Sequence, residues 1–348
     1  MIPYGRQNID ESDIDAVISV LRSDFLTQGP VVPQFEQALC ERTGAGYAVA
    51  VNSATSALHI ACLALGLGPG DVLWTVPNTF VASANCGRYC GADVDFVDID
   101  PQTWNMSVAA LSEKLQAASK LNRLPKVIVP VHFAGQPTEQ EAIWELAREF
   151  GVKVLEDASH AVGASRNGEP VGSCRWSDIT VFSFHPVKIV TSGEGGVALT
   201  NDMALFEQMA MLRTHGITRD AARFVGSSPG HWYYEQQLLG FNYRLTDLQA
   251  ALGLAQLGRI DQFLARRNYL AERYRARLAS LPLLLPTVQP GNRSAFHLYV
   301  VRLRNGEGAA GHRRVMDRMR AAGIGVNVHY TPVHLQPYYA RLGFTQGM

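Results

Sequence analysis

The stretch TVFSFHPVKIVTSGEGG, at residues 180–196, decides the fold, because it joins an apolar strand to a glycine-rich turn and carries an unusual lysine. The chain has five lysines and twenty-six arginines, so arginine serves wherever a surface cation is needed. Lys188 therefore needs a chemical reason. A lysine amine can lose its proton and attack a carbonyl, which an arginine guanidinium cannot do. Taken alone, the stretch favours a lysine whose stem packs on apolar residues at a strand end.

Composition indicates a protein with a large apolar core and balanced charge. Its 348 residues are 47% hydrophobic and 18% charged, and the formal net charge is zero. This balance argues against nucleic acid or an anionic membrane surface as the main partner. No run approaches the ~20 apolar residues of a membrane helix, and the N-terminus lacks an apolar signal core. Five cysteines without a CxxC pair are typical of free thiols and not of a zinc site, so we expect a cytoplasmic protein without a metal centre.

Short apolar segments alternate with helical patterns through the first two thirds of the chain. Near-continuous apolar strands with helices between them predict a mostly parallel sheet that is covered on both faces. The fold class is therefore α/β, with seven strands. The predicted strands lie at 47–51, 72–76, 94–99, 127–132, 152–156, 179–184 and 196–200, and the helices at 10–22, 33–43, 54–65, 82–89, 108–118, 139–150 and 204–213.

A change of pattern near residue 245 predicts a second domain. The segment 254–279 is a long amphipathic helix in which acidic residues interleave with many arginines, so a solvated linking helix is favoured over a nucleic-acid surface. Strands at 296–303 and 326–329 flank a helix at 312–322. We therefore expect a large domain over residues 1–245 and a smaller α+β domain over 246–348.

Polar residues directly follow several of the predicted strands. In open α/β sheets, ligands bind beyond the carboxyl ends of the strands. Residues 52–56 (NSATS), His132, residues 157–160 (DASH) and residues 183–188 should therefore gather at one edge of the sheet. The sequence predicts a ligand site at this edge.

The segment NSATSALH, at residues 52–59, joins a strand to a helix and predicts a phosphate site. Its small hydroxyl-bearing residues leave the first N–H groups of the helix open, and such a terminus binds anions. Ser183, near the end of another strand, could add a hydroxyl. By itself the segment is at least as typical of a helix that Ser53 caps with nothing bound.

Asp157 ends an apolar strand, so we expect its carboxylate to be buried and to have a fixed positive partner. A pyridinium nitrogen would be such a partner, and keeping it protonated makes the ring an electron sink. A structural salt bridge or a helix cap is the alternative. Phe80 could supply a ring for stacking, although an aromatic residue there is more often part of the core.

Together, a phosphate site, a buried aspartate, a stacking ring and an amine describe a pocket for pyridoxal 5'-phosphate, with Lys188 as its Schiff-base residue. Two signatures of rival α/β chemistries, the P-loop and HExxH, are absent from the sequence.

These segments, in this order and spacing, closely resemble the DegT/DnrJ/EryC1/StrS family of sugar aminotransferases, which have fold type I of the pyridoxal-phosphate enzymes. The resemblance covers nearly the whole chain. The branch that aminates C4 of a UDP-linked 4-keto-6-deoxy sugar in pseudaminic acid biosynthesis is the most similar. The matching segments are FLTQGP, VNSATSALHIACLALGLGPGD, NTFVASAN, VDID, PVHFAGQP, EDASHAVGA, VFSFHPVKIVTSGEGG, RTHGI and GFNYRLTDLQAALGLAQL.

The resemblance implies a role for each matching residue. Lys188 would be catalytic, and Asp157 would pair with the pyridine nitrogen. Asn242 would reach across a homodimer interface to the phosphate of the neighbouring subunit. The remaining implied cofactor contacts are Ala54, Thr55, Phe80, His160 and Ser183, and the implied nucleotide-sugar contacts are Tyr4, Asp24, Phe25, Leu26, Thr27, Ala54, Ser183, Asn242, His329, Tyr330, Thr331 and Pro332.

The implied reaction moves an amino group, from L-glutamate, to C4 of a UDP-linked 4-keto-6-deoxy-N-acetyl hexose. Three alternatives stay open. Another sugar aminotransferase of the family, making UDP-4-amino-arabinose or GDP-perosamine, is the strongest. A pyridoxamine-dependent sugar dehydratase would carry histidine in place of Lys188, and a non-enzymatic relative would be expected to have lost part of the Lys188, Asp157 and Ser183 set. Relatives continue past the equivalent of Phe344, so we expect the small domain to be truncated.

Overall fold

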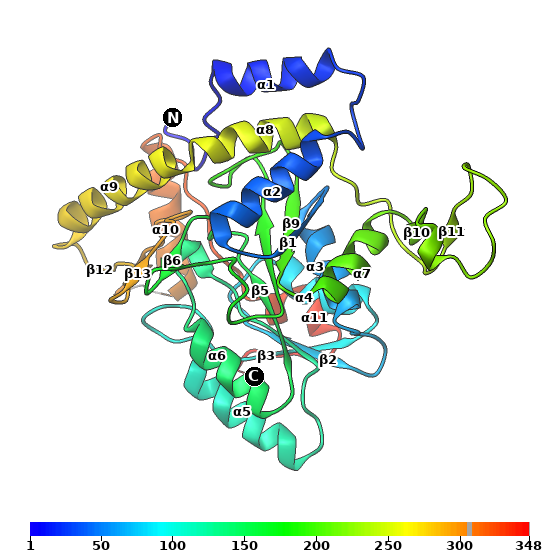
Figure 1. The fold of residues 1–348 in the computed structure, drawn as a ribbon. Helices are drawn as coiled ribbons and strands as arrows, with labels where there is room; N and C mark the ends of the chain where they lie inside the picture. Colours follow the sequence, from blue (N-terminus) through cyan, green and yellow to red (C-terminus); the bar gives the residue numbers. More distant parts are fainter. Residues whose placement is uncertain (305–307, 348) are drawn as a thin grey trace.

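A computed structural model describes residues 1–304 and 308–347 of the chain, and its centre is a seven-stranded sheet (Figure 1). The strands lie in the order β1-β9-β8-β5-β4-β2-β3. β9 runs antiparallel to β1 and β8, and the other neighbours are parallel, which confirms the mostly parallel sheet. The bounds are β1 (Tyr47–Val51), β2 (Val72–Thr75), β3 (Asp93–Phe96), β4 (Val127–Val129), β5 (Lys153–Asp157), β8 (Ile179–Ser183) and β9 (Gly196–Thr200).

Helices cover both faces of this sheet, and the alternation of side chains along each strand assigns the residues to a face. In β5, Leu155 packs with the helices α3 and α4, whereas Val154 packs with α5 and α6 on the opposite face. Asp157 therefore lies on the α3 and α4 face, and Glu156 on the other. These helices and α7 are α3 (Ala54–Ala64), α4 (Ala82–Tyr89), α5 (Val108–Lys120), α6 (Gln140–Glu149) and α7 (Met203–Arg213).

The predicted single helix at 254–279 is wrong, because two helices, α8 (Asp247–Gly258) and α9 (Ile260–Leu278), meet at Arg259. The φ of −104° and ψ of 4° at Arg259 end the first helix, and its guanidinium forms ion pairs with Asp10 and Asp13. α8 packs against α1 (Glu11–Leu21) and α2 (Val31–Thr43), which belong to the N-terminal part of the chain (Figure 1). The domain boundary at 245/246 stays a prediction.

The C-terminal part has less regular structure than the sequence predicts. Of the strand expected at 296–303, only β14 (Arg302–Leu303) forms, paired with β12 (Leu283–Leu284). Phe296 has a φ of +41°, a left-handed conformation that a strand does not contain. The strand expected at 326–329 is also wrong, since backbone pairing falls instead on Ile324, which bridges Ile2. The helix expected at 312–322 is α10 (Gly308–Ala321), and α11 (Pro337–Ala340) follows.

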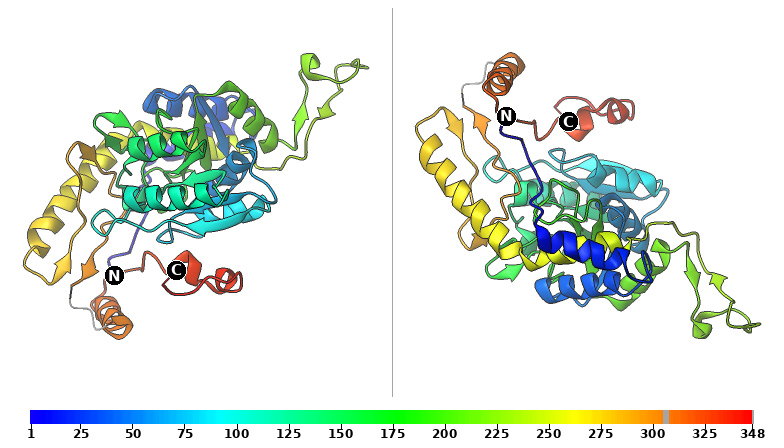
Figure 2. Two further views of the ribbon diagram at one scale, coloured as in Figure 1. Left: turned by 90° about the horizontal axis from the view of Figure 1, so that it is seen from below. Right: turned by 90° about the horizontal axis from the view of Figure 1, so that it is seen from above.

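Two segments extend away from these layers. The N-terminal residues run in an extended path from α1 to the C-terminal part (Figure 2), where Ile2 N–H donates to Gly323 O at 2.7 Å. On the opposite side, β10 (Ile217–Thr218) and β11 (Glu235–Gln236) form a hairpin arm that projects from the body (Figures 1 and 2). A small sheet joins β6 (Ser165–Arg166), β7 (Glu169–Pro170) and β13 (Asn292–Arg293). Within the described ranges, no helix is long and apolar enough to cross a membrane.

Candidate active site

Lys188 lies in the turn that follows β8, where its N–H donates to His185 O at 2.9 Å. Burial lowers the pKa of the Lys188 amine to about 8, and the Asp157 carboxylate opposes this shift. A lysine in water has a pKa near 10.4. The site therefore gives Lys188 a substantial neutral fraction near physiological pH, which a nucleophile or general base requires.

Asp157 is the last residue of β5 and is only 5% exposed. Ser83 Oγ donates to Asp157 Oδ2 at 2.6 Å, while Ser159 donates to Oδ1 through Oγ at 2.6 Å and through N–H at 3.1 Å. Over residues 1–304 and 308–347, no arginine or lysine forms a salt bridge with Asp157. Its carboxylate is thus oriented by hydroxyl groups and free to accept from a further N–H donor.

The first turn of α3 forms the predicted anion cradle. Ser53 caps the helix by accepting from Ser56 N–H at 3.1 Å, and in the described structure the N–H groups of Ala54 and Thr55 have no protein acceptor. β9 passes close to this turn, because a Cβ on Gly196 would lie 2.5 Å from Ala54 N. Ser183 pairs with Gly196 across the sheet, which places Ser183 beside the same turn. Helix N-termini with open N–H groups bind phosphate.

Histidine and tyrosine side chains form a second wall near Lys188. His160 Nδ1 accepts from Ala134 N–H at 3.3 Å, so the remaining proton lies on Nε2, which is 3.4 Å from Tyr330 Oη. Tyr4 Oη lies 2.7 Å from His329 Nε2. Burial, with the charge of Lys188, lowers the pKa of His160 well below its usual value and that of His329 to about 4. These two imidazoles are neutral at physiological pH.

The loop that carries Phe80 connects this wall to Asp157. Phe80 precedes α4 and is 59% exposed, so its ring is available to a ligand. Asn78 Oδ1 accepts from Tyr330 N–H at 3.3 Å, and Pro77 O accepts from Val333 N–H at 2.9 Å, directly after Thr331 and Pro332. The loop therefore contacts Tyr330 and Val333 on one side. On the other side it leads into α4, where Ser83 donates to Asp157.

Two other predicted groups are held by contacts with the start of α8 and with the strand end before α3. The segment Asp24, Phe25, Leu26 and Thr27 packs on the start of α8, where Leu26 O accepts from Asp247 N–H at 3.0 Å and Thr27 bridges Thr246. Asn242 is exposed, and its carbonyl oxygen lies 3.5 Å from Asn52 Nδ2, just before the anion cradle. Their predicted roles stay predictions.

Three residues at the site were given no individual role from the sequence. Ser83 and Ser159 donate to Asp157, and the ring of His297 lies 4.4 Å from that of His160. Ser83 also lies 2.8 Å from Thr79 Oγ1, so the spacing of Thr79 and Ser83, one helical turn apart in NTFVAS, could have indicated a hydroxyl pair. No local pattern marks His297, which enters the site from the C-terminal part.

The geometry agrees with comparisons with known proteins. The sequence profile of the DegT/DnrJ/EryC1/StrS aminotransferase family matches residues 7–347. The chain belongs to this family. This family member is 40% identical, over 98% of the chain and 86% of the relative, to the spore coat polysaccharide biosynthesis protein SpsC of Bacillus subtilis.

Solved structures of other family aminotransferases superpose closely. PseC of Helicobacter pylori, an aminotransferase involved in the biosynthesis of pseudoaminic acid, has a TM-score of 0.89 at 32% identity, covering 100% of this chain and 89% of that one. Spr1654 of Streptococcus pneumoniae, in its PMP form, has a TM-score of 0.89 at 30% identity, covering 99% and 89%. The chain is therefore a pyridoxal-phosphate-dependent sugar aminotransferase of fold type I.

The residues present fit pyridoxal phosphate. Ala54 and Thr55 offer open N–H groups for a phosphate, and position 196 has no room for a side chain, so glycine lets β9 approach this turn. Asp157 offers a buried, hydroxyl-oriented carboxylate for a pyridinium nitrogen, and Lys188 offers an amine of lowered pKa for the aldehyde. Among the residues that the structure describes, no cluster of histidine, cysteine or carboxylate side chains could hold a metal ion.

Proposed function

We propose that this enzyme transfers an amino group from L-glutamate to C4 of a UDP-linked 4-keto-6-deoxy-N-acetyl hexose, which gives UDP-4-amino-4,6-dideoxy-N-acetyl-β-L-altrosamine for pseudaminic acid synthesis. The observation that carries the transfer is Lys188 beside Asp157 at the carboxyl edge of the sheet. The similarity to PseC supports the choice of sugar.

In this proposal, each residue has a defined task. Ala54, Thr55 and Ser183 hold the cofactor phosphate, Phe80 covers the ring, and His160 contacts its edge. Pyridoxal phosphate, when bound, supplies the electron sink. Lys188 takes the α-proton from the amino donor and later returns a proton to C4 of the sugar, while Asp157 keeps the ring nitrogen protonated. Tyr4, His329, Tyr330, Thr331 and Pro332 would line the sugar cleft, and Asp24, Phe25, Leu26 and Thr27 would complete it.

A direct assay tests the substrate. Purified enzyme with L-glutamate is offered the UDP-linked 4-keto-6-deoxy-N-acetyl sugar, and the product is identified by mass spectrometry and NMR. A C4 amine with the altro configuration supports the proposal. Turnover of a different keto sugar, with no reaction on this one, would overturn the assignment of the sugar and keep the aminotransferase.

The alternative substrates left open by the sequence belong in the same assay. These are UDP-4-keto-arabinose and GDP-4-keto-6-deoxymannose, and the ratio of kcat/KM between substrates decides between the classes.

A homodimer is part of the proposal. The hairpin arm exposes large apolar side chains away from the body of the chain, since Val225 is 90% and Trp232 73% exposed. Such exposed apolar groups on a projecting arm fit a second copy of the chain as partner. Asn242 would then act on the phosphate of the neighbouring subunit.

Subunit complementation tests this role of Asn242. Two variants, Lys188→Ala and Asn242→Ala, are mixed, dissociated and reassociated. If Asn242 acts across the interface, one site of each mixed dimer regains an intact Lys188 and Asn242, and activity returns. If Asn242 acts within its own chain, beside Asn52, no mixed site is intact and activity stays absent.

We propose a cytoplasmic location for this enzyme. Its five cysteines are free, which agrees with a reducing compartment.

A further inference from the structure

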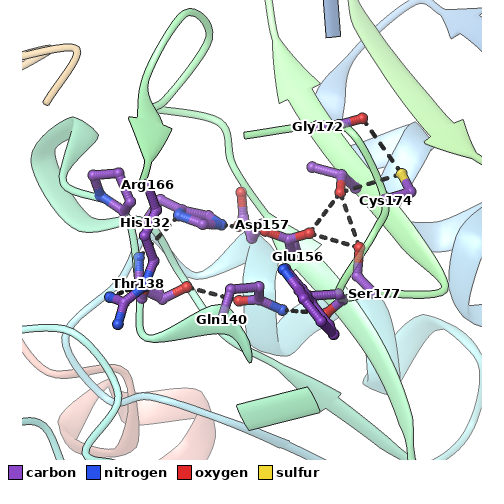
Figure 3. A network of polar contacts seen from close by, with 12 residues as sticks. His132, Thr138, Gln140, Glu156, Asp157, Arg166, Gly172, Cys174 and Ser177 are labelled. Atoms are coloured by element: carbon purple, nitrogen blue, oxygen red, sulfur yellow. Dashed lines mark hydrogen bonds and ion pairs between the residues drawn. The ribbon is translucent and has the colours of Figure 1, made fainter. Parts of the chain in front are cut away.

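Behind Asp157, on the opposite face of β5, Glu156 is the centre of a closed network of hydrogen bonds (Figure 3). Glu156 is 4% exposed. Its Oε1 accepts from Ser177 Oγ at 2.6 Å and from Thr180 Oγ1 at 2.8 Å, and its Oε2 lies 2.7 Å from His132 Nε2. The network is distinct from the hydroxyl groups that hold Asp157.

His132 binds both residues of the strand end. Its Nδ1 accepts from Thr138 N–H at 3.2 Å, so the ring proton lies on Nε2 and is donated to Glu156. Its own main-chain N–H donates to Asp157 O at 3.1 Å, and Asp157 N–H donates to Pro130 O at 2.9 Å. Residues 130–132 thus hold residue 156 by its side chain and residue 157 by its backbone.

Three hydrogen-bond donors converge on the buried side chain of Glu156. Burial raises the pKa of the neighbouring Cys174 thiol to about 12. Within the described residues, no lysine or arginine forms an ion pair with Glu156. Breaking one of its hydrogen bonds would leave a buried charge partly unsatisfied, which costs more than the bond itself contributes.

A polar cavity of about 170 Å³ borders the network, and its lining includes His132, Glu156, Thr138, Gln140, Arg166 and Trp176. On this face, tight apolar packing therefore does not fix the end of β5. The hydrogen bonds to Glu156 and His132 add to the backbone pairing of this end with β8, while Leu155 and Val154 are packed one or two residues earlier. A shift of this strand end would move the Asp157 carboxylate.

We propose that His132 and Glu156 form a positioning pair, which sets the place of the Asp157 carboxylate against the pyridine nitrogen from the far side of the sheet. The inference rests on the proposed role of Asp157. Neither residue touches the cofactor, and both act through the backbone of residues 156 and 157.

A double-mutant cycle tests the pair. The dissociation constant for pyridoxal phosphate is measured by equilibrium dialysis for wild type, His132→Phe, Asp157→Asn and the double variant. His132→Phe keeps a ring of similar size and removes both nitrogen atoms. We expect it to weaken binding about tenfold in wild type and to change little when Asp157 is already asparagine, because interacting residues are not additive. The pH midpoint of the visible absorbance band of the bound cofactor should also shift in His132→Phe, and this shift should be small when Asp157 is already asparagine.

The controls separate positioning from simple stability. Arg175→Gln alters the same cavity at an exposed side chain that pairs with Glu169 and leaves the Glu156 hydrogen bonds intact, so it should leave both readouts unchanged. If His132→Phe does not fold, Ser177→Ala takes its place, because it removes a single donor from Glu156. We expect it to weaken pyridoxal phosphate binding about threefold, and to change little when Asp157 is already asparagine.

Three results would overturn the inference, and they have different consequences for the proposed function. Equal losses with and without Asp157, or a lower unfolding temperature with unchanged cofactor binding and band midpoint, would make the pair purely structural and leave the proposed function in place. An Asp157→Asn variant that binds and absorbs like wild type would overturn the proposed role of Asp157, and the inference with it.

Discussion

Glu156 and Asp157 are consecutive carboxylates on one strand, with nearly equal exposure of 4% and 5%, yet they face different surroundings. Each accepts three hydrogen bonds from the protein. Across from Asp157 lies the amine of Lys188, whereas His132 and a polar cavity lie across from Glu156. Burial and hydrogen bonding alone therefore do not identify a functional carboxylate. The two carboxylates are distinguished by the group that each one faces.

The largest effect should follow from removing the amine on the Asp157 side. We expect Lys188→Ala to lower kcat by about 10⁴-fold, because the lysine is both the attachment point and the proton carrier. The visible band of the lysine-bound cofactor should be absent as well. If Lys188→Ala kept its activity and a normal visible band, the amine would not be what makes the Asp157 side of β5 functional.

A smaller loss should follow from neutralising the carboxylate that faces Lys188. Asp157→Asn keeps the shape and removes the charge that holds the pyridine nitrogen protonated, and we expect kcat to fall by roughly 10²-fold. Steady-state kinetics at saturating L-glutamate would measure this loss. Glu156→Gln, on the opposite face, should lower kcat less than Asp157→Asn does, because glutamine keeps an acceptor for His132 and the hydroxyl partners can reverse their hydrogen bonds.

Ser83→Ala would sharpen the comparison at a single hydrogen bond. It removes the donor to Asp157 Oδ2, and hydrogen bonds to charged groups contribute about 1.5–3 kcal/mol, so cofactor affinity should fall at least about tenfold. Thr79→Val loses only the hydroxyl next to Ser83 and should have a smaller effect. Equal affinities for Ser83→Ala and wild type would contradict the proposed support of Asp157.

The smallest expected effect is a shift in pH dependence. The pKa of Lys188 is lowered to about 8, so the amine is mainly protonated below that pH and neutral above it. In the cofactor-free enzyme, modification of Lys188 by an amine-directed reagent should therefore rise with pH, with a midpoint near pH 8. In Asp157→Asn the midpoint should move lower, because the carboxylate raises the lysine pKa. Peptide mapping can follow Lys188 separately, since the chain has only five lysines.

Local sequence patterns predicted the sheet and its edge, because apolar strands and the residues after them are fixed by the chain itself. β1 and β9 have the predicted bounds, and the predicted helix at 82–89 is α4. The helix break at Arg259 was missed because its cause is tertiary, namely ion pairs with Asp10 and Asp13. His297 was missed for a similar reason, since only the folded chain brings it to His160.

The C-terminal strands were overpredicted because an alternation of apolar residues was interpreted as a strand, although no partner strand was identified for it. A strand needs a partner, and over 326–329 the backbone bridge lies at Ile324 instead, with the N-terminal residue Ile2. The roles of Asn242 and of Asp24, Phe25, Leu26 and Thr27 came from resemblance, and one chain alone does not test them. Their positions depend on contacts that a single sequence does not contain.

The extended N-terminal segment has a practical consequence. Within its first five residues, Ile2 is hydrogen-bonded to the C-terminal part, Tyr4 reaches His329, and Gly5 lies against Val187, where an added Cβ would stand 3.8 Å from Val187 Cβ. A purification tag or protease scar fused ahead of Met1 would therefore emerge beside the proposed sugar cleft. Kinetic comparisons between preparations should match their N-terminal sequences, because an apparent difference in sugar preference could originate in the vector.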